Sequence, residues 1–142
     1  MANQLQLEIV TPQKRILQTT TTSVTLPGSI GELGILPEHI PLLTTLNSGV
    51  LTYQDNGKTQ AIAIHWGYAQ VEGNRVTVLA QLAEPAREID TTRAQTAEKK
   101  AVQVLTELIH SPSAGDDELK RMDKFEAKLK RALVRQQAAR YQ

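Results

Sequence analysis

The stretch GVLTYQDNGKTQAIAIHWG (residues 49–67) carries the clearest structural signal in the chain. Two runs rich in Val, Ile, Thr and Tyr, at about 49–54 and 59–66, flank a turn that contains Asn56 and Gly57. Asn-Gly supplies the positive φ angles that a tight β-hairpin requires. We therefore predict two antiparallel strands joined by this turn.

The same pattern of two strand-like runs joined by a glycine-containing turn recurs after this hairpin, and a further strand is expected before it. Gly73-Asn74 interrupts the stretch 68–82, and the segment LQLEIVT (5–11) alternates apolar and polar residues. Short strands with regular turns and no intervening helices are typical of an antiparallel sandwich or barrel. The other strands are predicted at 5–11, at 16–26 (as one strand or two), at 68–72 and at 75–82.

After residue 84 the apolar period becomes helical. Asp90 precedes a first helix over about 91–110, and Pro112 and Gly115 lie in a break at 110–117. The predicted apolar face of this helix contains Ala94, Ala97, Ala101, Leu105 and Leu108.

A second helix is predicted from about 117 to 139, and its stripe is narrow and partly polar: Leu119, Met122, Glu126, Leu129, Leu133 and Gln136. Two helices with a short connection form an antiparallel hairpin. The fold class is therefore α+β, with a β domain over 1–84 and a helical hairpin over 85–142.

Composition excludes several classes of protein. Aromatic residues make up 4% of the 142 residues and the formal net charge is +1, so nucleic-acid binding is not expected. The chain has no Cys, which excludes disulfides and cysteine chemistry. We see no signal peptide and no run of 18 apolar residues, so any membrane association is expected only through a partner.

Charge is uneven between the two parts. Residues 1–84 have a net charge of −2 and residues 85–142 a net charge of +3. The last sixteen residues hold five cations and no acidic residue, which favours an acidic partner or a solvated face. These cations are Lys128, Lys130, Arg131, Arg135 and Arg140.

Catalytic and metal-binding patterns are weak. His39, His65 and His110 lack the spacing of metal ligands, so we expect no metal site. Glu38 and His39 are adjacent and suited to acid–base work, but such a pair more often makes hydrogen bonds within a loop. We therefore expect a protein without catalytic residues that acts by binding or assembly.

Two positions in the helical part have both a structural and a functional interpretation. Asp90 suits the N-cap of the first helix, and with Arg93 it also suits a polar ligand pocket. Arg131 and Arg135 are four residues apart, so they share a helix face. That face is either solvated or able to clamp a phosphate.

The block GELGILPEHIPLLTTLNSGVL (31–51) begins with an apolar segment, 31–43, that we interpret as a loop stiffened by Pro37 and Pro41. This block strongly resembles the signature of the epsilon subunit of F-type ATP synthases. The segments HWGYAQVEGNRVTVLA (65–80) and IDTTRA (89–94) resemble later elements of the same family, although Trp66 is unusual there.

The resemblance implies a β-sandwich followed by a helical hairpin, in a central-stalk subunit that couples the catalytic head to the membrane ring. Residues 1–84 would bind the gamma subunit and the c-ring. Glu32 and Leu33, at the tip of the loop, would face the ring, and His39 would lie near gamma. The 85–142 hairpin would be regulatory.

The resemblance also implies a mobile hairpin that inhibits ATP hydrolysis when it is extended. Its basic face would then meet the beta subunit through residues that include Lys128, Lys130 and Arg140. A narrow apolar seam suits such a switch, because its two packings must differ by only a few kcal/mol. With no transit-type segment seen, we expect the cytoplasmic face of a bacterial inner membrane.

Some family members bind ATP in the folded hairpin, and the matching positions here are Ile89, Asp90, Arg93, Ala94, Arg131 and Arg135. The alternative function is therefore an ATP-sensing module, with ATP as a regulatory ligand and no required cofactor. A third hypothesis, of another class, is an enzyme that uses Glu38 and His39.

Overall fold

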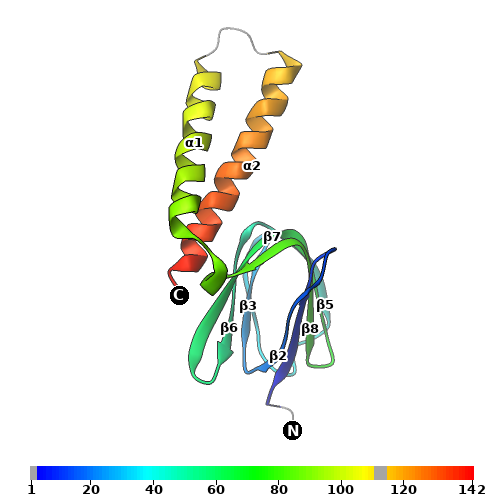
Figure 1. The fold of residues 1–142 in the computed structure, drawn as a ribbon. Coiled ribbons are helices and arrows are strands. Elements are labelled where there is room, and N and C mark those ends of the chain that lie inside the picture. Colours follow the sequence, from blue (N-terminus) through cyan, green and yellow to red (C-terminus); the bar gives the residue numbers. More distant parts are fainter. Residues whose placement is uncertain (1–2, 111–114) are drawn as a thin grey trace.

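The computed structural model describes residues 3–110 and 115–142, and Figure 1 shows a β-sandwich from whose end a pair of helices projects. The described strands are β1 (Leu5–Val10), β2 (Arg15–Thr21), β3 (Val24–Gly28), β4 (Gly31–Ile35), β5 (Leu42–Leu46), β6 (Gly49–Asp55), β7 (Lys58–Glu72) and β8 (Arg75–Pro85). A 3₁₀ turn (Ala86–Glu88) leads to the helices α1 (Thr91–Ile109) and α2 (Asp116–Ala139). The predicted fold class, a β-sandwich followed by a helical hairpin, is confirmed.

The strands follow the order β2-β1-β8-β7-β5-β3-β4, and β6 pairs with both β7 and β3. The paired strands of the described residues run antiparallel, except β1 and β8, which run parallel. Alternation along strands such as β1 and β3 places one row of aliphatic side chains inside. Leu5, Leu7 and Ile9 of β1 are fully buried, as their spacing predicts.

Strand β7 is longer than predicted, because the segments 59–66 and 68–72 form one strand of 15 residues. Its first half pairs with β6 and its second half with β5. The change of partner falls at Trp66, whose φ is 62°, and at the following Gly67. A Cβ at Gly67 would lie 2.1 Å from the Leu79 carbonyl oxygen, so only glycine fits this approach to β8.

The expected loop over 31–43 is wrong, because it contains all of β4 and the start of β5. Two glycines did not prevent an edge strand, since Ile35 pairs with Val24 of β3 and is buried. The connection is limited to residues 36–41. The turn that precedes β4 is Ser29-Ile30, so Glu32 and Leu33 lie within a strand and not at a loop tip.

Helix α1 begins as predicted, because the Asp90 carboxylate accepts a hydrogen bond from the Arg93 N–H at 3.0 Å. Ala101 and Leu105 pack against Phe125 of α2. Pro112, in the predicted break, lies outside the described residues.

The predicted stripe of α2 is wrong in part. Leu119 and Leu133 are exposed, whereas Phe125 is buried, with Met122 and Leu129 beside it. One apolar stripe does not describe the buried residues of α2, because this helix packs on two different surfaces. Its first half packs on α1 and its last turns also pack on the sandwich.

The hairpin rests on the sandwich through a small apolar contact at the end of α2, and the helices extend away from it (Figure 1). Val134, Ala138 and Ala139 pack against Ala63 of β7 and Ile89. We call this contact the joint.

A polar cluster lies beside the joint. Glu84 of β8 accepts from Nε of Arg135 at 2.7 Å, and the same oxygen, Oε1, lies 3.3 Å from Nε2 of His65. The hydrogen bond from His65 lowers the pKa of Glu84 below its ordinary value of 4.5, and Arg135 adds to this effect against an opposing effect of burial. The carboxylate therefore connects β7, β8 and α2.

Replacing Gly67 by Ala should destabilise the sandwich by about 3 kcal/mol, because the new methyl group overlaps the β8 backbone. Chemical denaturation measures this change. Gly34→Ala is the matched control, since a Cβ there meets nothing within 4 Å. Equal stability of the two variants would contradict the prediction.

Glu84→Gln should remove a pH-dependent part of the stability. Because the pKa of Glu84 is lowered in the folded state, its contribution is present above its ordinary value of 4.5 and disappears as the pH falls through the lowered value. The difference in unfolding free energy between wild type and Glu84→Gln should therefore shrink on acidification below about pH 5. Urea denaturation across this range measures it, and a difference that stays constant would contradict it.

Candidate functional site: a basic groove in the hairpin

The two helices enclose a cavity of about 320 Å³ near the joint, which we call the basic groove. Ala97, Ala101 and Phe125 form its apolar wall. Among the described residues, those that line it include five cations and no carboxylate. These cations are Arg93, Lys100, Lys128, Arg131 and Arg135.

A second cavity of about 230 Å³ adjoins the groove and shares Arg93 and Arg135 with it. We call it the mixed pocket, because three carboxylates also line it. They belong to Glu84, Glu88 and Asp90, and Ile89 and Ala94 complete its wall.

The six residues predicted for ATP binding therefore lie around these two adjoining cavities. Ile89, Asp90 and Ala94 line the mixed pocket, and Arg131 lines the basic groove. Two of the side chains already have partners. Asp90 caps α1, and Arg135 is paired with Glu84. A phosphate group is favoured in the groove, where the carboxylates of the mixed pocket do not oppose it.

Lys128 shows how the cations of the groove affect one another. Its ammonium lies 4.7 Å from the centre of the Phe125 ring. Desolvation lowers the pKa of Lys128, and the nearby cations Lys124, Lys100 and Arg131 lower it further. These like charges disfavour one another, so an anion that enters the groove relieves their repulsion.

Sequence reasoning missed Lys100 and Phe125 in this groove. Lys100 is seven residues after Arg93, which places both on one face of α1, and this spacing was the available signal. Phe125 is the single phenylalanine of the chain, but it lies off the predicted apolar stripe.

The five C-terminal cations do not share one face. Lys128, Arg131 and Arg135 line the basic groove. Lys130 lines a different cavity of about 360 Å³ between α2 and the sandwich, and Arg140 is exposed at the end of α2.

The residues predicted to contact rotor partners lie in the sandwich. Glu32 is exposed on β4, and Leu33 packs partly against the core. His39 lies in the 36–41 connection with its Nδ1 2.7 Å from the Ile40 carbonyl oxygen. The backbone N–H of Glu38 donates to Asn74 Oδ1 at 2.6 Å, which ties this connection to the turn between β7 and β8.

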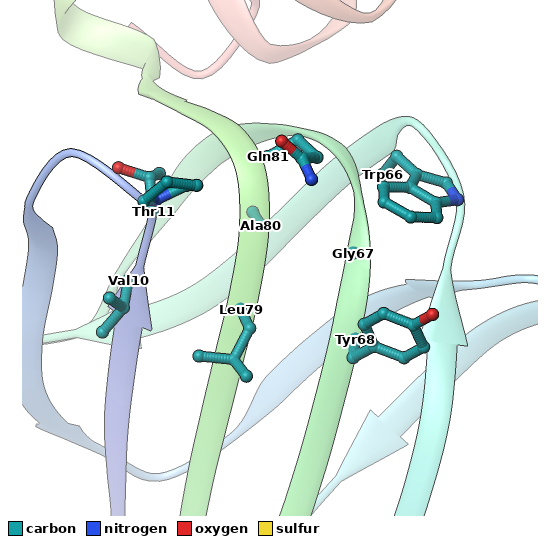
Figure 2. A pocket seen from close by; sticks show the side chains of 9 residues that line it. Val10, Thr11, Trp66, Gly67, Tyr68, Leu79, Ala80 and Gln81 are labelled. Carbon is teal, nitrogen blue, oxygen red and sulfur yellow. The ribbon is translucent and has the colours of Figure 1, made fainter.

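A further surface on the sandwich was not identified from the sequence as a site. Figure 2 shows Trp66 and Tyr68 of β7, Leu79 of β8 and Val10 of β1 beside one another on neighbouring strands. Trp66 is 51% and Leu79 54% exposed, and the two aromatic rings meet edge to face at 5.9 Å. We call this surface the aromatic patch. The sequence feature that could have indicated this patch is the strand alternation, which places residues 66 and 68 outside the core.

No three His, Cys, Asp or Glu side chains gather in a metal-binding arrangement within residues 3–110 and 115–142. Neither helix in the described part of the chain is long and apolar enough to cross a membrane.

Comparison with known structures shows the same fold in two mitochondrial assemblies. A chain of the Euglena gracilis ATP synthase structure (OSCP/F1/c-ring) has a TM-score of 0.80 and 23% identity, with 97% of this chain and 82% of that chain covered. A chain of the Tetrahymena thermophila central stalk/c-ring structure has a TM-score of 0.62 and 14% identity, with 95% and 96% covered. At these identities the likeness concerns the fold alone.

Sequence comparison identifies the family. Residues 4–86 match the family model described as ATP synthase, Delta/Epsilon chain, beta-sandwich domain. The ATP synthase epsilon chain of Geotalea uraniireducens is 45% identical over 139 residues, covering 98% of this chain and 96% of the relative. That of Geobacter sulfurreducens is 42% identical with the same coverage. With a matching sandwich, a matching family model and bacterial relatives along nearly its full length, this chain belongs to the ATP synthase epsilon chain family.

Proposed function

We propose that this chain, a non-catalytic member of the epsilon family, couples the catalytic head of a proton-translocating ATP synthase to its membrane ring and inhibits ATP hydrolysis through its helices. The observation that carries the proposal is the small joint. The hairpin meets the sandwich mainly through the last turns of α2 and the Glu84 cluster. Such a contact permits a second position of the hairpin with little loss of buried surface.

In this proposal the sandwich binds the gamma subunit and the c-ring, and the chain reaches the membrane only through the complex. Exposed apolar surface on the sandwich supports a protein partner there. Ile40, in the 36–41 connection, and Leu43, in β5, are 75% and 74% exposed, and the aromatic patch adds a second apolar surface. Glu32, Leu33 and His39 remain the proposed contacts with the rotor.

The proposed place of the subunit is peripheral, at the cytoplasmic face of a bacterial inner membrane. The family relatives reported above are bacterial, which supports the bacterial assignment. The regulatory partner of the released hairpin is an acidic segment of the beta subunit. The surplus of cations on α2 gives that segment a complementary surface.

A second function, binding of ATP by the folded hairpin, is favoured by the basic groove. Its cations suit the phosphates, and its apolar wall suits part of the nucleoside. ATP bound there holds α1 and α2 together and opposes release of the hairpin.

The inhibitory role predicts the effect of removing the C-terminal cations. Replacing Lys128, Lys130, Arg131, Arg135 and Arg140 by Ala should raise ATP hydrolysis by the assembled enzyme about threefold or more, because the attraction to an acidic partner is lost. Hydrolysis by complexes reconstituted with each form measures this. Lys14→Ala with Lys58→Ala, in the sandwich, is the control and should leave hydrolysis unchanged. Unaltered hydrolysis in the five-residue variant would count against inhibition.

The nucleotide function predicts a selective loss of ATP affinity. Calorimetry of the isolated chain with millimolar ATP should show binding that Arg131→Ala weakens about tenfold, because a charge-assisted hydrogen bond is lost. Adding Arg135→Ala should weaken it further. Lys130→Ala is the matched control, since Lys130 neighbours Arg131 in sequence but lies outside the groove. Equal loss in Arg131→Ala and Lys130→Ala would show a nonspecific charge effect.

A further inference from the structure

The cavity of about 360 Å³ between α2 and the sandwich is not used by the proposed function, and we call it the α2–sandwich cavity. Its volume lies in the range of roughly 300 to 1,000 Å³ that is typical of small-molecule sites. Both parts of the chain contribute to its wall. The sandwich supplies Ser48, His65, Trp66, Gln81 and Leu82, and α2 supplies Ala127, Lys130 and Arg131.

The charge of this wall favours an anion. Its described lining residues include two cations, Lys130 and Arg131, and no carboxylate. Neither cation forms an ion pair within the described part of the chain, so both charges are available to a ligand. Glu84, which contacts the His65 ring, is already paired with Arg135.

The sandwich contributes apolar surface to the same cavity. The half-exposed indole of Trp66 and the exposed side chain of Leu82 both line it. Trp66 also lines the pocket of the aromatic patch, so its ring borders both cavities (Figure 2). The face of an indole is a platform on which another flat ring stacks.

The backbone at Trp66 is strained. Its φ of 62° lies in the left-handed region, which bulky side chains rarely adopt. Such conformations persist only where the surrounding structure imposes them, and they cluster at functional sites. Trp66 does not belong to the core of the sandwich, so core packing does not account for this large ring.

We propose that the α2–sandwich cavity binds a small aromatic anion, that is, a flat apolar ring that carries a phosphate or carboxylate group. The ring stacks on Trp66 beside Leu82. The anionic group contacts Lys130 and Arg131, and the Ser48 hydroxyl is a further donor to it. Such a ligand matches a wall that is apolar on the sandwich and cationic on α2.

A ligand held by both walls joins α2 to the sandwich. It binds the docked arrangement alone, because release of the hairpin separates Trp66 from Lys130 and Arg131. At ten times its dissociation constant it therefore shifts the equilibrium about tenfold toward docking. This consequence rests on the mobile hairpin of the proposed function, whereas the binding itself does not.

The test measures binding to the isolated full chain by calorimetry and by the fluorescence of Trp66, the single Trp of the sequence. Two probes are used, phenyl phosphate and phenylacetate, and the tighter one identifies the anionic group. We expect a dissociation constant on the order of 1 mM, because the probes are small. Inorganic phosphate lacks the ring and benzyl alcohol lacks the charge, so each should bind at least about tenfold more weakly.

Substitutions locate the site. Lys130→Ala and Trp66→Asn should each weaken binding about tenfold, and Asn tolerates the positive φ at this position. Trp66→Phe keeps a flat ring and should restore most of the affinity. Lys128→Ala is the matched control, because Lys128 lies two residues from Lys130 but lines the basic groove instead. Arg131 is unsuitable for this comparison, since it lines both cavities.

Docking is followed by energy transfer between two fluorescent labels. The chain has no Cys, so Lys58→Cys at the start of β7 and Lys124→Cys in α2 accept the labels. In urea titrations, the tighter probe at ten times its dissociation constant should raise the docking constant about tenfold. The same concentration should raise it only about twofold in Lys130→Ala, because the affinity is lower.

Two binding results would overturn the site. One is the absence of binding by both probes. The other is a loss in Lys128→Ala as large as that in Lys130→Ala, which would place the probe in the basic groove. In both cases the urea titrations without probe still report whether the hairpin moves.

The docking measurement separates the inference from the proposed function. Binding with no rise in the docking constant, in a chain whose hairpin urea does release, would overturn the bridging role of the ligand. Loss of energy transfer only together with the far-UV circular dichroism of the sandwich would overturn the mobility of the hairpin. The binding results would stand in that case.

Discussion

The close approach of β7 and β8 at Gly67 is the constraint on which the rest of the structure depends. The two backbones are too near for any side chain at this position. Here β7 changes its partner from β6 to β5, so one strand belongs to both halves of the sandwich. The positive φ at Trp66 also sets the direction in which the side chains of residues 65 and 66 point. His65 is buried beside the joint, against Glu84, and Trp66 lies on the outer surface.

The joint connects this sandwich to the helices through a small set of apolar groups. Small side chains such as Ala138 and Ala139 bring α2 close to β7, but they bury little apolar area. The polar contact from Glu84 to Arg135 adds a directional bond to this small apolar contact. A contact of this kind is sensitive to charge, and it lies next to the basic groove and the mixed pocket, which share Arg135.

Local patterns predicted the parts of the structure that local physics decides. Asn56-Gly57 formed its turn, and Asp90 capped α1, because each depends on a few neighbouring residues. The α2 stripe failed because two different surfaces bury that helix. The loop expected over 31–43 failed because pairing with β3 outweighed the low strand preference of glycine.

The residues of the candidate site were also predicted only in part. The family resemblance indicated residues in and just before α1 and in α2, and the fold brings them around two adjoining cavities. The spacing of apolar residues did not indicate Lys100 or Phe125, which line the same groove. The pairing of Glu84 with Arg135 joins positions 51 residues apart in the sequence, so no local pattern could reveal it.

The basic groove has a consequence for how the folded hairpin responds to dissolved salt. Five cations held around one cavity repel one another, and mobile ions weaken that repulsion over a distance of about 8 Å at physiological ionic strength. Dilute buffer therefore strains the closed pair of helices, while concentrated electrolyte relaxes it. Through this groove the ionic strength of the solution is expected to alter the stability of the closed helix pair.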